Sequence, residues 1–177
     1  MFGQRAFFCF SAVVMTLGGS VSVDAQRLRG LAAQATAAEF HAAMLQAVNS
    51  ERAKAGAGQL CYNKKLQSAA QGHSEDQASH NVMQHEGSNG STLGQRVTAQ
   101  GFKWSAVAEN VAAGQIDVAA VMSSWMNSPG HRENLLNPRY KFFGMGYAYN
   151  ENGEYKSFWT QDFADSTTEG SDGCPGD

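Results

Sequence analysis

The stretch Trp125–Asn134, WMNSPGHREN, joins two predicted helices across a Pro-Gly break. A residue before proline is disfavoured in the helical region, so the first helix is predicted to end at Ser128. His131 then heads a second short helix, where the backbone rather than a loose loop fixes its direction. Its possible partners lie upstream, at His85 and Glu109. We expect folding to bring these three side chains to one cleft.

The rest of the chain divides into helices first and strands last. Apolar periodicity predicts helices over 39–55, from Asn63 to about Asn81, over 116–127 and over 131–136. Residues 84–104 are predicted to be a loop with short helical pieces, and residues 109–112 a short strand. Two further strands, 142–149 and 155–163, flank an Asn-Gly hairpin signal. This order indicates an α+β fold with a small antiparallel sheet.

Two smaller patterns lie inside these elements. Gly144 and Gly146 alternate with larger residues in a strand, which indicates that another backbone or a large ring approaches there. His73 lies on the inward stripe of the second helix. A hydrogen-bonded core histidine is favoured there over a ligand.

Composition and the N-terminus indicate an exported single domain. The 177 residues carry a net charge of −3, which gives no basic surface for nucleic acid. Residues 1–25 are predicted to be a signal peptide, with Arg5 before an apolar run that is short for a membrane span. An uncleaved anchor is the alternative; after cleavage no transmembrane span is expected. A leader (26–38), a domain (39–164) and an acidic Gly/Ser-rich tail (165–177), mobile except at Cys174, follow.

Cysteine use agrees with export. Cys61 and Cys174 remain after signal removal, and an even pair in an oxidising compartment predicts a disulfide, with two free thiols as the alternative. Closing so long a loop is worth about 4–5 kcal/mol in the chain-entropy model. Asn89 begins an Asn-Gly-Ser glycosylation sequon, relevant if the source is eukaryotic.

Seven short motifs in order resemble the CAP superfamily, also called SCP-like or pathogenesis-related-1-like proteins. Each is weak alone, but together they span about residues 39–164. They are Asn49-x-x-Arg52, Ala70-x-x-His73-Ser74, His85-x-Gly87 before Arg96 and Gly101, Ala108–Ala112, Trp125–Asn134, Gly144-x-Gly146 and Trp159-Thr160-Gln161-x-Phe163.

The resemblance implies an α-β-α sandwich with a central cleft that holds two histidines and two acids. His85 and His131 match the histidines, and Glu109 matches the first acid. Ser128 stands at the position of the second acid, as in bacterial-type members, so the chain keeps three of the four groups.

Two imidazoles and a carboxylate are the ligand set of an open zinc site, so His85, Glu109 and His131 are candidates to hold Zn or another divalent cation weakly. Glu109 can either ligate the metal or orient an imidazole. The alternative is a hydrogen-bonded cluster that binds no metal. A metal-dependent peptidase with Glu109 as base is the runner-up function.

The resemblance favours a secreted, monomeric, non-enzymatic module that binds lipid or sterol or contacts an extracellular protein, with host–pathogen interaction and virulence as the wider setting. Six aromatic residues are candidates either to line an apolar groove or to fill the core. They are Phe102, Trp104, Phe142, Phe143, Tyr147 and Tyr149.

Overall fold

The computed structural model describes residues 39–174, and its frame is a four-stranded sheet in the order β1–β3–β4–β2. The two long C-terminal strands, β3 (Phe142–Tyr149) and β4 (Ser157–Asp165), form an antiparallel hairpin. β2 (Ala106–Ala113) pairs antiparallel with β4, and the two-residue β1 (Cys61–Tyr62) pairs parallel with β3. The predicted small sheet is confirmed, with β1 as an addition.

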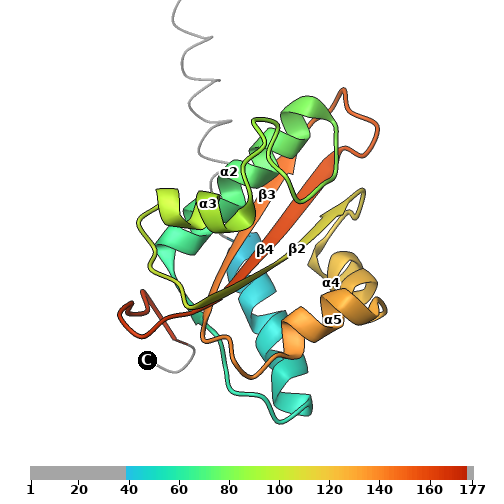
Figure 1. Ribbon diagram of the computed structural model, residues 1–177. Coiled ribbons are helices and arrows are strands. Elements are labelled where there is room, and N and C mark those ends of the chain that lie inside the picture. Colours follow the sequence, from blue (N-terminus) through green and yellow to red (C-terminus); the bar gives the residue numbers. More distant parts are fainter. Residues whose placement is uncertain (1–38, 175–177) are drawn as a thin grey trace, which may run out of the picture. The chain divides into compact units, whose positions relative to one another are not determined.

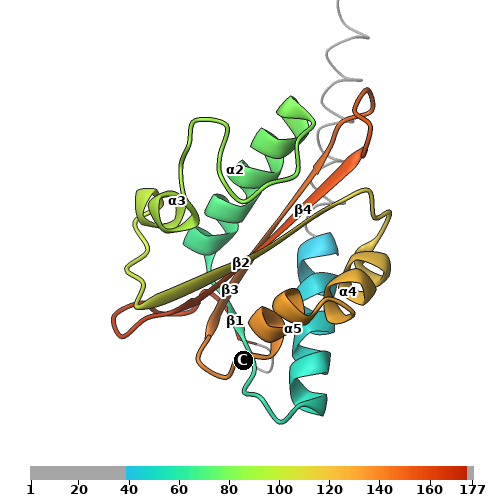
Figure 2. The same cartoon turned by 45° about the vertical axis from the view of Figure 1, so that its right-hand side comes forward.

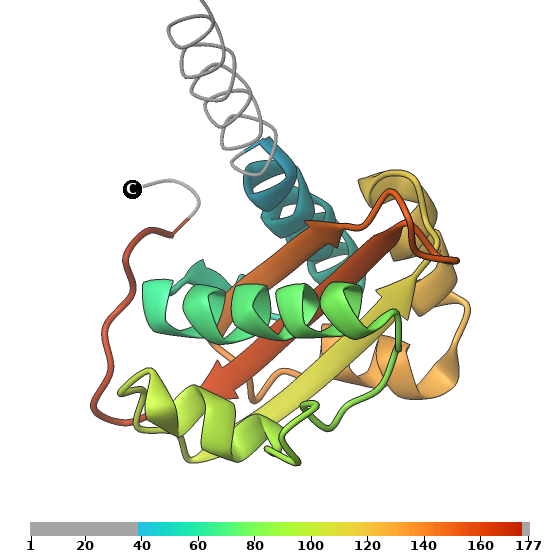
Figure 3. The same ribbon diagram turned by 90° about the horizontal axis from the view of Figure 1, so that it is seen from above.

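Helices cover both faces of this sheet. α2 (Lys64–His80) and α3 (Leu93–Ala99) lie on one face. The helix over 39–54, α4 (Val118–Met126) and α5 (Pro129–Leu136) lie on the other, as Figures 1 and 2 show. Seen from above in Figure 3, α2 runs across the strands with α3 beside it. The three layers confirm the α+β sandwich.

Local capping signals set most helix ends. The Asn63 side chain accepts hydrogen bonds from the backbone N–H groups of Lys65 and Leu66, and α2 ends at Asn81 in the left-handed conformation. α5 begins at Pro129 rather than at His131, because proline is favoured in the first turn of a helix. α3 lies within the predicted loop, where Thr92 and Gln95 form a capping box.

Alternating residues of β3 and β4 give the sheet two different faces. We call the side toward helix 39–54, α4 and α5 the apolar face, because its strand residues join one large core with these helices. The strand residues of that core are Ala112, Phe143, Met145, Trp159 and Phe163.

We call the side toward α2 and α3 the polar face. Gly144 and Gly146 lie there directly against the backbone of α2, where an added Cβ would overlap Leu66, Gln67 and Ala70. The close approach predicted for these glycines is confirmed. A smaller apolar cluster on this face includes Leu66, Val97 and Phe102.

The predicted Cys61–Cys174 disulfide is present. The tail does not depend on it alone: Asn63 Nδ2 donates to Gly170 O over 3.0 Å, and Tyr62 N donates to Gly173 O over 2.7 Å. The segment 166–174 is therefore bonded along β1 and the start of α2, contrary to the expectation of a tail held only at Cys174.

The predicted signal peptide and leader lie outside the described residues. Among the helices that are described, none has the length and apolar character needed to cross a membrane.

Candidate functional site

Glu109 is the centre of the polar face. Its side chain, on the edge strand β2, is only 2% exposed. His85 Nδ1 donates to Glu109 Oε1 over 2.9 Å, and Arg96 Nη2 donates to Oε2 over 2.5 Å. Both carboxylate oxygens are therefore occupied by charge-assisted bonds.

The loop after α2 carries His85 to this carboxylate. Asp76 of α2 fixes the loop by accepting hydrogen bonds from the backbone N–H and the hydroxyl of Ser88, over 2.7 and 2.6 Å. Arg96, in α3, fixes it from the other side, because its Nη1 donates to the carbonyls of His85 and Ser91 over 2.9 Å each. Arg96 thus holds the histidine loop and the carboxylate at once.

His131 approaches from α5 with a different partner. Its Nδ1 lies 2.9 Å from Ser128 Oγ, so the residue at the second-acid position still contacts the imidazole. Asn134 and Asn110 tie α5 to β2, through Asn134 Nδ2 to Glu109 O over 3.2 Å and Asn110 Nδ2 to His131 O over 3.2 Å. The two imidazoles therefore flank the same edge strand.

Their different partners give the two histidines opposite pKa shifts. The hydrogen bond to Glu109 raises the pKa of His85 above its ordinary value. Burial, and then the charge of His85, lower the pKa of His131. Ser128 orients its imidazole without stabilising the charged form, whereas Glu109 does both.

Behind Glu109 lie two more buried titratable groups. His73 Nε2 lies 2.9 Å from Gln84 O and 3.8 Å from Glu109 Oε2, and burial lowers the pKa of His73. The predicted role of His73 as a hydrogen-bonded core histidine fits these contacts. The second group, Asp162, is the cross-strand partner of Glu109 and is fully buried.

Asp162 is the second acid of this cluster. No group among residues 39–174 donates a hydrogen bond to either of its carboxylate oxygens. Burial and the neighbouring charge of Glu109 raise the pKa of Asp162 well above its ordinary value. For Glu109 itself, burial favours the neutral form, but the hydrogen bond from His85 and the charges of His73 and Arg96 outweigh it and lower the pKa.

The predicted ligands meet only in part. His85 and His131 each use Nδ1 for an orienting contact, and neither Nε2 has a hydrogen bond among the described residues. Each oxygen of Glu109 already accepts one hydrogen bond, from His85 or from Arg96. No group of three or more His, Cys, Asp or Glu within residues 39–174 is arranged to hold a metal ion. The geometry thus supplies two imidazole nitrogens, Nε2 of His85 and Nε2 of His131, that are available to a ligand.

Sequence reasoning missed the roles of two residues. Arg96 appears in the motif series only as a spacing marker, and Asp162 is the variable position before Phe163. An acid inside a strand covered on both faces is a detectable signal, because a buried carboxyl needs either a partner or a proton.

The candidate aromatic groove is not assembled as such. Phe102, Phe142 and Phe143 are core residues with at most 8% exposure, while Trp104 and Tyr149 are 43% and 61% exposed. Asn89 lies exposed in the loop before α3, and its glycosylation stays a prediction.

Comparison with known proteins identifies similar chains. The family model described as "Cysteine-rich secretory protein family", CAP, matches residues 45–163. The uncharacterized protein YkwD of Bacillus subtilis is 31% identical over 131 residues, which are 74% of this chain and 49% of that protein. The uncharacterized membrane protein YlbC of the same bacterium is 30% identical over 68% of this chain and 33% of its own length.

Solved structures agree with these matches. An extracellular SCP-domain protein from Bacillus anthracis has a TM-score of 0.64 and 29% identity, covering 73% of this chain and 41% of that one. A cysteine-rich secretory protein from Staphylococcus aureus has the same fold at 22% identity, with a TM-score of 0.58 over 73% of this chain and 39% of that one. The chain spans half or less of the Bacillus proteins it matches.

Proposed function

Because the chain belongs to the CAP family, we propose that it is an extracellular binding module that holds an apolar lipid chain in a groove between helix 39–54 and the disulfide-linked tail. The observation that carries this proposal is a groove of about 610 Å³ with no charged residue in its wall. This volume lies in the range of small-molecule sites.

One stripe of the helix forms the floor of the groove. Ala42, Leu45 and Ala53 recur at helical spacing and present small or apolar side chains. The amide of Asn49, in the same stripe, is engaged by the backbone of Leu60 through bonds of 3.0 and 2.8 Å. The wall also carries the polar side chains of Gln46, Ser50, Gln59 and Tyr62 but no charge, which suits a hydrocarbon chain or sterol ring that ends in a polar group.

The test uses two adjacent alanines of the same helix. Both alanines are exposed, but Ala42→Glu places a carboxylate on the groove wall, whereas Ala43→Glu places it at a position that does not line the groove. We expect Ala42→Glu to weaken binding of palmitate or cholesterol roughly tenfold or more, because the charge must be desolvated or displaced. Ala43→Glu should bind like wild type.

Fluorescence displacement with the two ligands in parallel measures this and separates fatty acid from sterol. Equal binding by both variants would show that the ligand binds outside this groove. A wild-type protein that binds neither ligand would refute the proposal.

A second candidate function is weak divalent-metal binding. The specific observation is the pair of oriented imidazoles with unpaired Nε2 atoms on His85 and His131. Two nitrogen donors leave the remaining positions of a zinc ion to water, so the affinity should be low. Glu109 and Ser128 would act by orienting the imidazoles.

Calorimetric titration with ZnCl₂ tests this candidate. His131→Ala should abolish binding, and Ser128→Ala should weaken it by roughly tenfold, because loss of an orienting contact costs 10–100-fold in affinity. Zinc binding that survives in His131→Ala would refute the two-imidazole site. The peptidase alternative needs Glu109 as the base, and each of its oxygens already accepts a hydrogen bond from His85 or Arg96.

A further inference from the structure

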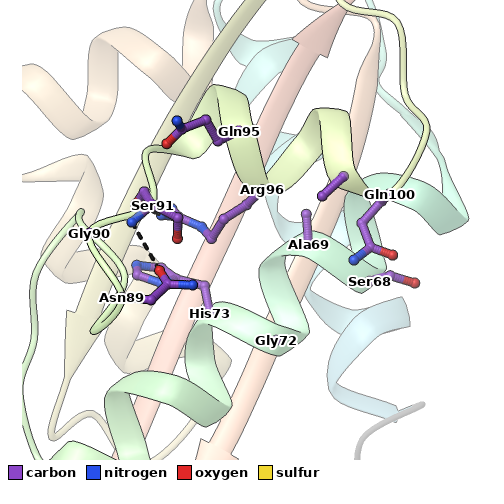
Figure 4. Close-up of a pocket in the computed structure, with 11 residues that line it drawn as sticks. Ser68, Ala69, Gly72, His73, Asn89, Gly90, Ser91, Gln95, Arg96 and Gln100 are labelled. Carbon is purple, nitrogen blue, oxygen red and sulfur yellow. Dashed lines mark hydrogen bonds between the residues drawn. The ribbon is translucent and has the colours of Figure 1, made fainter.

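A second cavity, separate from the lipid groove, lies between α2, the loop before α3, and α3 itself. Its volume is about 490 Å³. Figure 4 shows Ala69 and Gly72 on α2, Asn89 on the loop, Gln95 on α3 and Gln100 at the C-cap of α3 around it. It shares none of its lining residues with the groove at helix 39–54.

Gly72 is the feature of this cavity that the fold does not explain. It lies inside the 17-residue helix α2, where glycine is less stable than alanine. Gly144 and Gly146 are glycines because a Cβ would overlap α2, but a Cβ on Gly72 would meet nothing within 4 Å. Its φ is also not in the left-handed region. A bare helix backbone facing a cavity is what close approach of a ligand requires.

The rim carries side-chain amides with unused hydrogen-bonding groups. Asn89 Oδ1 accepts from Ser91 N over 2.9 Å, and Gln95 Oε1 accepts from Thr92 N over 2.9 Å, which leaves the NH₂ group of each unpaired among the described residues. Gln100 uses neither end of its amide there. Amides offer both donors and acceptors, and hydroxyl groups have the same dual character.

The charge of the cavity excludes an ionic ligand. Arg96 is the one charged residue in its wall, and its guanidinium is already neutralised by Glu109 at 2.5 Å. Arg96 Nη1 is bonded to two carbonyls. No carboxylate lines the cavity, and burial lowers the pKa of His73. A ligand that fits is polar but uncharged.

We propose that the cavity over Gly72 is a carbohydrate site, in which a neutral sugar ring lies against Ala69 and Gly72 while its hydroxyls bond to the amides of Asn89, Gln95 and Gln100. A peptide fits less well, because the wall offers neither a charged partner nor a deep apolar pocket for a side chain.

The test fills the cavity without disturbing the fold. Gly72→Leu adds a side chain where the space is open and replaces glycine with a better helix former, so the variant should melt no lower than wild type. The probes are the trimer of N-acetylglucosamine and maltotriose, titrated into the full protein and followed by amide chemical shifts. We expect at least one probe to shift Gly72, Gln95 and Gln100, and Gly72→Leu to weaken its binding at least tenfold.

A matched variant distinguishes filling of the cavity from a general effect of replacing Gly72. Gly72→Ala adds one methyl group and should weaken binding less than Gly72→Leu. The proposal is overturned if neither sugar binds at millimolar concentration, if binding is unchanged in Gly72→Leu, or if an uncharged peptide such as N-acetyl-trialanine amide shifts these residues while the sugars do not.

Discussion

The two faces of the sheet share their strands but bury different chemistry. Asp162 and Phe163 are neighbours on β4 and point to opposite sides. Phe163, on the apolar face, packs with Tyr140 and Phe143 at ring-centroid distances of 6.0 and 5.5 Å. Asp162, on the polar face, adjoins Glu109 in a cluster with Arg96 and two histidines.

This difference separates the face that supplies stability by apolar packing from the face that carries the titratable groups. The apolar face packs large side chains of the strands against three helices, and these contacts need no specific bonding partner, because dispersion and the hydrophobic effect are non-directional. The polar face holds its side chains by specific hydrogen bonds and ion pairs, and the energy of these interactions depends on which groups are protonated. Substitutions on the two faces should therefore differ in kind as well as in size.

The largest loss is expected from Phe163→Ala. Phe163 is fully buried, so removing its ring should lower the free energy of unfolding by about 3–5 kcal/mol. Urea denaturation measures this, with Tyr149→Ala, 61% exposed on β3, as a control that should change stability by less than about 0.5 kcal/mol. A loss below about 1 kcal/mol for Phe163→Ala would contradict the assignment of stability to the apolar face.

Glu109→Gln should be the most damaging change on the polar face. It leaves Arg96 buried without its counter-charge, which typically costs about 3 kcal/mol. The pKa of His85 should fall, because the bond to Glu109 raises it in the wild type.

The pH dependence of this pair has a definite sign. A raised histidine pKa stabilises the fold below the unfolded value of 6.5, and this contribution is lost as pH rises through the folded pKa. NMR titration of the His85 ring follows the shift directly. An unchanged His85 pKa in Glu109→Gln would show that the hydrogen bond does not control it.

A smaller loss is expected where α2 touches the sheet. Gly144→Ala places a Cβ against the backbone of Leu66 and Gln67, and such overpacking costs about 1–3 kcal/mol. Gly72→Ala is the matched glycine in open space and should stabilise the protein by up to about 1 kcal/mol. Thermal unfolding of both variants measures the contrast, and similar behaviour of the two would disprove the close contact.

The smallest effect is expected for Asp162→Asn, which should change how the free energy of unfolding varies with pH. Because the pKa of Asp162 is raised, the folded protein keeps a proton that the unfolded chain releases above about pH 3.8. This contribution is present at low pH and is lost as pH rises toward the folded pKa. The Asp162→Asn variant cannot titrate at this position, so its stability should fall less than that of wild type as pH rises.

Asp165→Asn is the control with the opposite sign. The hydrogen bond from Lys141 lowers the pKa of Asp165, so its contribution is present above the unfolded pKa and is lost as pH falls. Denaturation curves from pH 4 to 8 compare the two variants. Parallel pH profiles for Asp162→Asn and wild type would show that Asp162 is ionised.

Much of the fold was predictable because local signals coincide with its elements. The Asn63 cap and the left-handed Asn81 each act within a few residues. The predicted β3–β4 hairpin is present, but its loop runs over 150–156, and Gly153 does not have the positive φ of a tight Asn-Gly turn. β1 could not be found this way, since two residues become a strand only by pairing with β3 and with Gly173. The capping box at Thr92 was a local signal for α3, but the many glycines around it favoured the prediction of a loop.

The site was predictable only in outline. Family resemblance selected His85, Glu109 and His131, and the structure places them around β2, but their role in metal binding stays a prediction. The engagement of both Glu109 oxygens depends on Arg96 and His85, which approach through tertiary structure that no spacing rule encodes. Asp162 depends in the same way on the register that pairs it with Glu109.

The bond between Cys61 and Cys174 brackets almost the whole described domain. A protease that cuts the backbone once anywhere between these cysteines leaves two fragments that are still one covalent molecule. Outside the cell, where proteases are common and reductants scarce, a nicked copy should keep its mass on a non-reducing gel. Its fragments should separate only after a thiol reagent is added.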